Sequence, residues 1–282
     1  MIPQRNLSLL SNRLTAKGGK RIPEKILEQD YCISWFLVGL SESPLKDIFL
    51  FKGGTSIKKC YVGDYRFSED LDFTLSKETS FEDILKYLEI AFNYTYKESG
   101  IMFHFIRQDR HTHKNTYTFF IGFEGPLPGG EKEIKVDVTI QEKVVWQILK
   151  KKVLREYKEY EDIPEDSILN VYSLNEISAE KIIALLDRAR NEPRDLYDIW
   201  YLSSHQHVDV SELIDGIELK LEFRGKKLID VREEFLRKEN RFKNLWNTRL
   251  SSQISVLPEF DHVYRTVQRE LRQAGLLKKR MI

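Results

Sequence analysis

Residues 49 to 75 read FLFKGGTSIKKCYVGDYRFSEDLDFTL and constrain the fold more than any other stretch of the chain. An apolar run, a double glycine, a short helix-compatible segment and a second apolar run follow one another, which predicts a strand, a turn, a helix and a returning strand. Because side chains alternate across a strand, Asp70 and Asp72 are expected on one face and Leu71 on the other. Two adjacent carboxylates repel each other unless a cation lies between them, so this unit predicts a cation site.

The glycine turn of the same unit is suited to bind an anion. Glycine lets the backbone approach a ligand closely, and the free N–H groups at a helix start favour an anion such as a triphosphate. Oxygen-only ligands suit Mg²⁺ or Mn²⁺, so a phosphate-binding turn beside the paired aspartates indicates phosphoryl or nucleotidyl transfer. The residues expected to bind the nucleotide in this segment are Lys52, Gly53, Gly54, Thr55, Ser56 and Arg66.

A third carboxylate is expected from residues 133 to 140, which read EIKVDVTI and alternate like a strand. Asp137 lies in the middle of this apolar strand, where an unpaired charge would be costly to bury. A nearby cation would remove that cost, which makes Asp137 the candidate third metal ligand beside Asp70 and Asp72. The alternative is an exposed acid on the polar face of an edge strand, together with Lys135.

The rest of the chain predicts an α+β fold in two domains. Apolar residues at helical spacing indicate helices at 23–40 and 81–98, and strand-like runs cover 102–107 and 116–122. After Lys143 the sequence reads as helical, and a charged segment looks like a connection out of the sheet. The first domain is therefore expected to span residues 1–150, and a helical domain residues 151–282.

Two helices of the second domain are expected to bring charged residues close together. The segment Asn175 to Asn191 shows a buried apolar stripe, and the next helix opens at Pro193. Lys181 and Arg188 are spaced so that one helix would carry both on one face. Surface ion pairs that tie a helical hairpin are the alternative to a functional role. The residues of this predicted cluster are Lys181, Arg188, Arg194, Asp195 and Asp198.

Charge is distributed unevenly although the net charge is only +1. Residues 220 to 282 carry 16 Lys and Arg against 8 Asp and Glu. A basic tail behind an acidic, metal-binding front would suit a nucleic-acid substrate, whereas a charged helical surface is the alternative. No apolar run is long enough to span a bilayer, and the two cysteines match no metal or redox motif, so we expect a cytosolic protein with no membrane partner.

Four segments together resemble the AbiEii/AbiGii toxin family. These segments are FKGGTSIKK, RFSEDLDFTL, KVDVTI and AEKIIALLDRARNEPRDLYDIWYL, and the resemblance covers roughly residues 22 to 202. The family supplies the nucleotidyltransferases of type IV toxin–antitoxin and phage-defence systems, within the polymerase-beta-like nucleotidyltransferase superfamily. The glycine turn of the superfamily is commonly Gly-Ser, whereas Gly54 is followed here by Thr55 and Ser56, so a hydroxyl is kept.

The resemblance implies a mixed sheet flanked by helices, followed by a helical domain that closes over the nucleotide. It also implies an NTP substrate, a divalent metal and a cognate antitoxin, and it places the cluster around Lys181 and Arg188 in a second functional region. Lys181 and Arg188 are expected to bind the nucleotide as well. Which of Asp195 and Asp198 acts there stays open. The full set of catalytic candidates is Asp70, Asp72, Asp137, Lys181, Asp195 and Asp198.

The expected reaction is a metal-dependent transfer of a nucleoside monophosphate from NTP to an acceptor hydroxyl, with pyrophosphate leaving. By resemblance to toxin relatives, the acceptor is the 3′ end of a tRNA. One alternative is transfer to a hydroxyl of a protein or a small molecule. Another is a nucleotide-binding toxin that has no turnover and inhibits a partner by contact.

Overall fold

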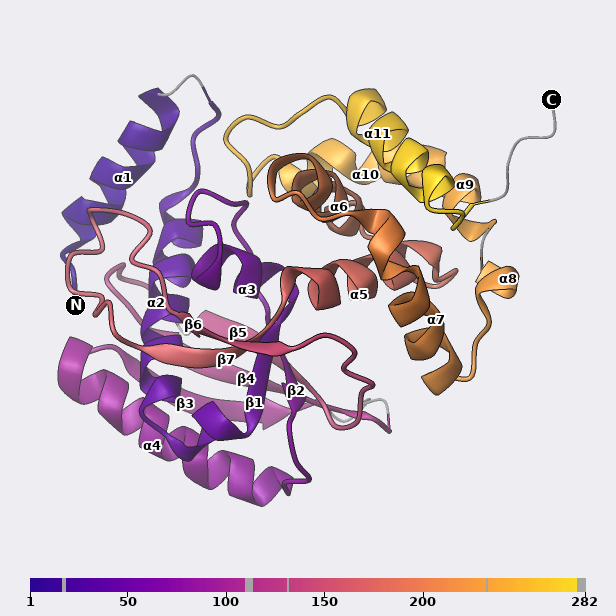
Figure 1. Ribbon diagram of the computed structural model, residues 1–282. Coiled ribbons are helices and arrows are strands. Elements are labelled where there is room, and N and C mark those ends of the chain that lie inside the picture. Colours follow the sequence, from indigo (N-terminus) through magenta and orange to yellow (C-terminus); the bar gives the residue numbers. More distant parts are fainter. Residues whose placement is uncertain (17–18, 110–113, 131, 232, 278–282) are drawn as a thin grey trace. The chain divides into compact units, whose positions relative to one another are not determined.

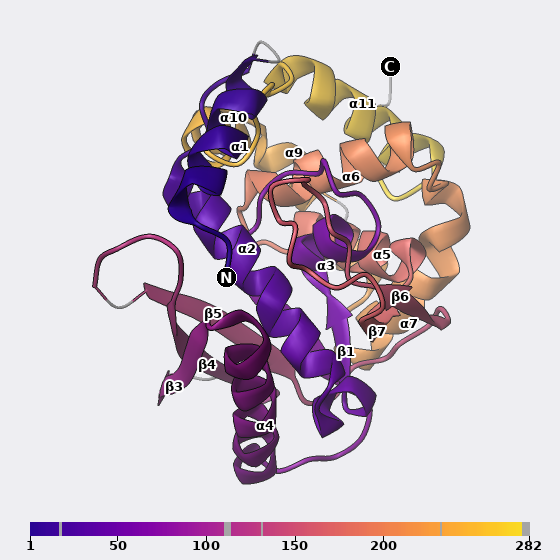
Figure 2. The same ribbon diagram turned by 90° about the vertical axis from the view of Figure 1, so that its left-hand side faces the viewer.

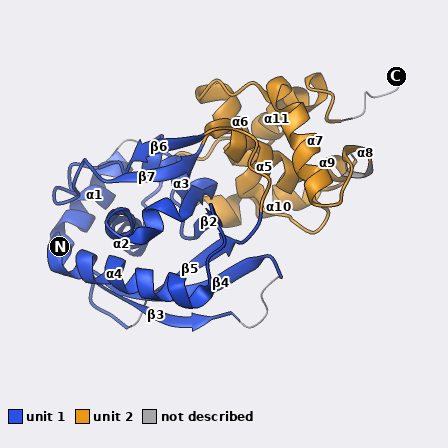
Figure 3. Cartoon of the chain, turned by 60° about the horizontal axis from the view of Figure 1, so that its bottom comes forward, with its two compact units in different colours: residues 1–141, 148–172, 253–255 blue, residues 142–147, 173–252, 256–282 orange. Residues whose placement is uncertain are grey.

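The computed structural model describes residues 1–16, 19–109, 114–130, 132–231 and 233–277, and confirms an α+β fold (Figure 1). The chain divides into two compact units (Figure 3). Unit 1 comprises Met1–Gln141, Ile148–Tyr172 and Gln253–Ser255, and unit 2 comprises Glu142–Gln147, Ser173–Ser252 and Val256–Ile282. The chain therefore passes between the units several times, whereas the sequence suggested one boundary near residue 150.

Unit 1 is built on a seven-stranded mixed sheet with the order β3-β4-β5-β2-β1-β7-β6. The strands are β1 (Phe49–Lys52), β2 (Leu71–Leu75), β3 (Met102–Gln108), β4 (Thr116–Glu124), β5 (Lys132–Thr139), β6 (Ile148–Lys152) and β7 (Ile168–Tyr172). The β2–β5 and β1–β7 pairs are parallel, and the other pairs are antiparallel. The predicted strand–turn–helix–strand unit is confirmed.

Helices cover one face of this sheet (Figure 2). They are α1 (Gln4–Ala16), α2 (Glu24–Ser41), α3 (Gly53–Cys60) and α4 (Phe81–Ser99), with the 3₁₀ turn η1 (Pro44–Asp47). Phe36 of α2 contacts both Phe92 of α4 and Phe103 of β3, with ring centroids 6.3 and 5.8 Å away. These contacts place α2 and α4 on the same side of the sheet, where aromatic rings pack against one another.

The two faces of the sheet differ because apolar and polar residues alternate along its strands. On β5, Ile134, Val136 and Val138 are fully buried in the core, whereas Lys135 and Asp137 on the opposite face are half-buried. Apolar residues therefore hold α2 and α4 on one face, and the other face is left polar. This polar face carries the candidate catalytic carboxylate of β5.

The segment after Lys143 differs from the helix predicted there. Residues 148–152 form β6, an edge strand that pairs with β7, so the sheet continues beyond residue 150. Its sequence ILKKK has no alternation to mark it as a strand, but lysines are common on edge strands because they discourage pairing with other chains. Tertiary pairing with β7 therefore decides the structure of this segment, which local propensity does not reveal.

Unit 2 is helical. It contains α5 (Leu174–Leu186), α6 (Pro193–His205), η2 (Val210–Leu213), α7 (Ile214–Phe223), α8 (Leu228–Val231), α9 (Glu234–Arg237), α10 (Glu239–Leu250) and α11 (Phe260–Gln273). Its core includes Leu196, Phe242, Trp246 and Val267, all buried. Helix α5 ends earlier than expected because Asp187 adopts an extended conformation.

Candidate active site

A row of polar residues crosses four neighbouring strands on the polar face of the sheet. Lys52 of β1 is the register partner of Asp72 on β2, and Asp72 is the partner of Asp137 on β5. Asp137 in turn pairs with Thr118 on β4. Side chains of direct register partners point to the same face, and neighbouring strands lie about 4.8 Å apart. The structure therefore brings Asp72 and Asp137 side by side, as the sequence predicted, with Asp70 immediately before β2.

Both carboxylate oxygens of Asp137 are occupied. The Thr118 hydroxyl donates to Oδ1 at 2.5 Å, and the Lys135 ammonium donates to Oδ2 at 2.6 Å. Burial disfavours the charge of Lys135, but Asp137, Asp70 and Asp72 outweigh this effect and raise the pKa of its ammonium. Lys135 therefore lies in the field of all three candidate metal ligands. From the sequence, Lys135 is expected only as the neighbour of an exposed acid.

The glycine turn lies directly against the row. Gly53 has φ +77°, a conformation that other residues rarely adopt, and a Cβ built on it would collide with the Asp72 carboxylate. A Cβ on Gly54 would lie 2.5 Å from Nη2 of Arg66. The double glycine is therefore required because a carboxylate and a guanidinium both approach the backbone here. Helix α3 begins at Gly53, so its first residue lies next to the Asp72 carboxylate.

The two hydroxyls that follow the glycines hold the turn together. Thr55 donates a short hydrogen bond to the backbone carbonyl of Asp70, and Ser56 donates to the carbonyl of Gly53 at 2.8 Å. Both side chains are buried. In this structure the hydroxyls thus fix the glycine turn against the Asp70–Asp72 segment, and the N–H groups of α3 remain the donors best suited to an anion.

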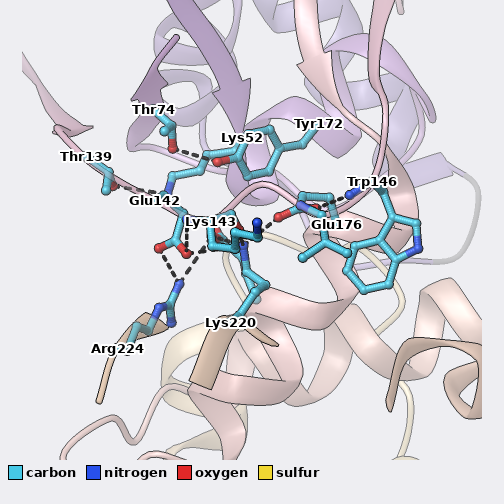
Figure 4. A network of polar contacts seen from close by, with 12 residues as sticks. Lys52, Thr74, Thr139, Glu142, Lys143, Trp146, Tyr172, Glu176, Lys220 and Arg224 are labelled. Carbon is cyan, nitrogen blue, oxygen red and sulfur yellow. Dashed lines mark hydrogen bonds and ion pairs between the residues drawn. The ribbon is translucent and has the colours of Figure 1, made fainter. Parts of the chain in front are cut away.

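Lys52 and Arg66 supply positive charge on either side of the turn. Lys52 Nζ donates to the Thr139 hydroxyl at 3.1 Å (Figure 4). Arg66 is buried, and its Nη1 donates to the Gln253 side-chain oxygen at 3.2 Å. Gln253 also accepts the Phe67 N–H at its backbone carbonyl, 2.9 Å away. This distant glutamine belongs to unit 1 and fixes the loop before β2, and nothing in the sequence pattern had pointed to it.

Asp70, Asp72 and Asp137 offer only oxygen ligands, so this donor set fits a hard divalent cation such as Mg²⁺. Among the described residues, no three His, Cys, Asp or Glu side chains are grouped closely enough to hold a metal ion as they stand. In this structure both oxygens of Asp137 accept hydrogen bonds from protein donors, Thr118 and Lys135.

A cavity of about 480 Å³ opens beside the row in unit 1. It is lined by Lys25, Gln29, Glu69, Asp70, Phe120, Phe123, Lys132, Glu133 and Lys135. The aromatic ring of Phe120 carries the Arg107 guanidinium 3.9 Å above its centre, and Arg107 also pairs with Glu133 at 2.6 Å. The wall of the cavity therefore contains Asp70, a candidate metal ligand, together with cationic and aromatic side chains.

The second predicted cluster forms within unit 2 between α5 and α6. Lys181 Nζ lies 2.7 Å from Asp195 Oδ1 and 2.9 Å from Asp198 Oδ2, and both carboxylates are buried. Burial raises the pKa of Asp195, but Lys181 and Arg190 outweigh this and lower it below its usual value. The predicted proximity of Lys181, Asp195 and Asp198 is confirmed.

The arginine of this cluster differs from the predicted one. Arg190 Nε lies 2.9 Å from Asp195 Oδ2, whereas Arg188 is exposed in the turn after α5. Because α5 ends at Leu186, Lys181 and Arg188 do not share one helix face. Arg194 pairs with Glu192 at 3.6 Å.

A further ion network in unit 2 was not foreseen (Figure 4). The fully buried Lys220 contacts Glu176 by a short ion pair, and it donates to the Lys143 carbonyl at 2.7 Å. Glu176 accepts the N–H groups of Val145 and Trp146 at 2.9 and 2.8 Å. The network anchors residues 142–147 to α5 and α7. Other charged residues share these helices, among them Glu180 on α5 and Glu218 on α7, so the sequence gives no signal that Glu176 and Lys220 are buried.

Comparison with known sequences and structures identifies the family. A sequence model described as "Nucleotidyl transferase AbiEii toxin, Type IV TA system" matches residues 35–266. The chain belongs to the AbiEii toxin family. It is therefore a nucleotidyltransferase toxin, and membership of a type IV system implies an antitoxin partner. The AbiEii match includes the glycine turn, the aspartates of β2 and β5, and the Lys181 cluster. Comparison with curated proteins gives no match.

Solved structures share the fold of this AbiEii chain. MenT4, a nucleotidyltransferase toxin from Mycobacterium tuberculosis, aligns with a TM-score of 0.57 and 16% identity, over 96% of this chain and 90% of MenT4. JHP933 from Helicobacter pylori aligns with a TM-score of 0.54 and 16% identity, over 90% of this chain and 93% of JHP933. A putative nucleotidyltransferase from H. pylori gives 0.51 and 16%, over 90% and 96%. Among the residues described, no helix has the length and apolar character required to cross a membrane.

Proposed function

We propose that this AbiEii-family enzyme transfers a nucleoside monophosphate from NTP to an acceptor hydroxyl, with Mg²⁺ or Mn²⁺ bound by Asp70, Asp72 and Asp137. The observation that carries the proposal is the register row in which Asp72 and Asp137 lie side by side against the Gly53 turn. When bound, the metal would lower the pKa of the acceptor hydroxyl and offset the charge of the triphosphate.

The residues around the turn bind the triphosphate. The N–H groups at the start of α3 face the anion, and Lys52 and Arg66 add positive charge where the pyrophosphate leaves. Thr55 and Ser56 keep the turn in its binding conformation through their hydrogen bonds to Asp70 and Gly53. The acceptor oxygen forms a bond to the α-phosphorus while the bond to the β-phosphate oxygen breaks, and Asp137 takes the acceptor proton.

Lys181 provides a second cation for a substrate phosphate. Asp195 and Asp198 position its ammonium, and Arg190 in turn pairs with Asp195. This assignment gives both aspartates a positioning role. It also explains why two buried carboxylates are kept at a site where apolar side chains would pack at lower cost.

The acceptor is the 3′ end of a tRNA. The resemblance to toxin relatives supports this choice, and so does the basic composition of residues 220–282. A toxin that blocks the tRNA acceptor end would stop translation, which suits a role in phage defence and requires a cognate antitoxin to hold it in check.

Incubation of the purified protein with α-labelled NTPs, total RNA and Mg²⁺ tests the proposal. We expect label in the tRNA fraction, its loss after addition of EDTA, and its loss in Asp72→Ala. Asp83→Asn, on α4 and outside the row, serves as the matched control and keeps activity. Label in protein or small molecules instead of RNA would reassign the acceptor. NTP binding without any transfer, together with growth inhibition that persists in Asp70→Ala, would support a toxin that acts by contact.

A further inference from the structure

Lys135 occupies a position that a metal ligand set would be expected to leave open. It lies two residues before Asp137 on the polar face of β5, and its ammonium contacts Asp137 Oδ2 at 2.6 Å. The other oxygen of Asp137 accepts from Thr118. A cation that binds Asp137 on the Oδ2 side must therefore replace the ammonium.

The charges around Lys135 are those that a divalent cation would neutralise. Its ammonium contacts Asp137, whose register partner is Asp72, and Lys135 and Asp70 line the same cavity. Three carboxylates repel one another in the absence of a cation, and a tethered ammonium reduces that repulsion. Lys135 thus supplies one positive charge where the metal would supply two.

We propose that Lys135 is a built-in counter-ion, which offsets part of the carboxylate charge in the metal-free protein and leaves Asp137 when a divalent cation binds. The inference rests on the proposed function, since it takes Asp70, Asp72 and Asp137 as the metal ligands. Lys135 acts as a positioning residue that sets metal affinity.

The surroundings of Lys135 allow it to move. Its side chain is 40% exposed and borders the 480 Å³ cavity, and a lysine has a flexible four-carbon stem. The neighbouring Lys132 is different, because it is held by Glu28 and by the Leu127 carbonyl, each at 2.7 Å. Lys135 has room to leave its carboxylate, whereas Lys132 is fixed in place.

Binding of Mn²⁺ alone to the full-length protein, measured by electron paramagnetic resonance without NTP, tests the inference. Removal of a unit charge next to the metal site in Lys135→Met should tighten Mn²⁺ binding roughly tenfold or more. Lys135→Arg keeps the charge and should stay near the wild-type affinity. Lys150→Met, which removes an exposed lysine from the distant edge strand β6, should leave the affinity unchanged.

A second measurement follows the lysine itself and does not depend on the variant folding. In reductively ¹³C-methylated protein, the Lys135 signal should shift as Mg²⁺ is added, and the shift should saturate at the Mg²⁺ affinity that calorimetry gives for the same sample. The inference would be overturned if Lys135→Met bound Mn²⁺ no more tightly than the wild type, or if the Lys135 signal did not change on addition of Mg²⁺. Either result would leave the proposed function intact. A wild type that binds neither metal would overturn the proposed function and this inference with it.

Discussion

Asp72 and Asp137 are register partners on the parallel strands β2 and β5, so their side chains share the polar face of the sheet. The sequence separates them widely, and only sheet formation brings them together. Replacement of either carboxylate should therefore remove the same function. We expect Asp137→Asn to lower nucleotide transfer by about 100-fold or more, the usual contribution of a catalytic base, with no loss of folded protein by circular dichroism. Activity close to the wild type in Asp137→Asn would contradict the proposed role.

Substitution of Gly53 distinguishes the effect of backbone strain on stability from the effect of a side chain next to Asp72 on activity. Gly53→Ala should cost about 1–2 kcal/mol through its left-handed conformation, and its methyl group should also displace the Asp72 carboxylate. We expect reduced stability in urea together with loss of transfer activity. Gly100 caps α4 with φ +76° and has open space around it. Gly100→Ala should therefore lose similar stability and keep its activity; equal activity in both variants would show that Asp72 tolerates displacement.

The buried pairing of Lys181 with two aspartates predicts a large loss of stability when the cation is removed. Lys181→Met leaves Asp195 and Asp198 without their shared ammonium, and breaking a buried pair on one side costs about 3 kcal/mol or more. Lys226→Met breaks an exposed pair with Asp187 and should cost about 1 kcal/mol or less. Chemical unfolding measures the free energy of unfolding of both variants. A small loss of stability in Lys181→Met would contradict a stabilising role for the buried ion pair.

The same ion cluster predicts how the stability of the folded protein changes at acid pH. Because Lys181 and Arg190 hold the pKa of Asp195 below its usual value of 3.8, Asp195 contributes stability above that value and loses it as the pH falls through its lowered pKa. In Lys181→Arg the charge is kept, so the acid dependence of unfolding should resemble the wild type. In Lys181→Met this contribution should shrink, and the unfolding curve near pH 3 should become flatter.

Glu156 predicts a dependence on pH of the opposite sign. It lies in a buried network with Lys59, 2.9 Å away, and burial raises the pKa of Glu156 from 4.5 to about 7. The folded protein therefore holds a proton that the unfolded chain releases, so stability should fall as the pH rises from about 4.5 to about 7. Glu156→Gln should reduce this slope, while the exposed Glu89→Gln on α4 should keep it. Urea unfolding at several pH values measures the slopes.

Much of the site could be predicted from local pattern. The double glycine marked a turn, alternation marked β2 and β5, and the cost of a charge in an apolar strand singled out Asp137. These features depend on neighbours in sequence, and the structure places them as predicted. The contact of Lys181 with Asp195 and Asp198 was also within reach, because two consecutive helices form it.

What could not be predicted depends on contacts between distant segments. Strand β6 exists because β7 pairs with it, not because its lysine-rich sequence favours a strand. Arg190 replaces Arg188 because α5 ends at an extended Asp187, a boundary that helical periodicity does not define. The hydrogen bonds of Gln253 to Arg66 and Phe67 span most of the chain, and a single glutamine in a polar stretch gives no hint of them.

The short segment Gln253–Ser255 belongs to the sheet-bearing unit although helices of the other unit flank it in sequence. A chain that ended between β7 and Gln253 would therefore lack the hydrogen bonds that Gln253 makes to Arg66 and Phe67. It would still contain strands β1 to β7 and the candidate metal ligands Asp70, Asp72 and Asp137.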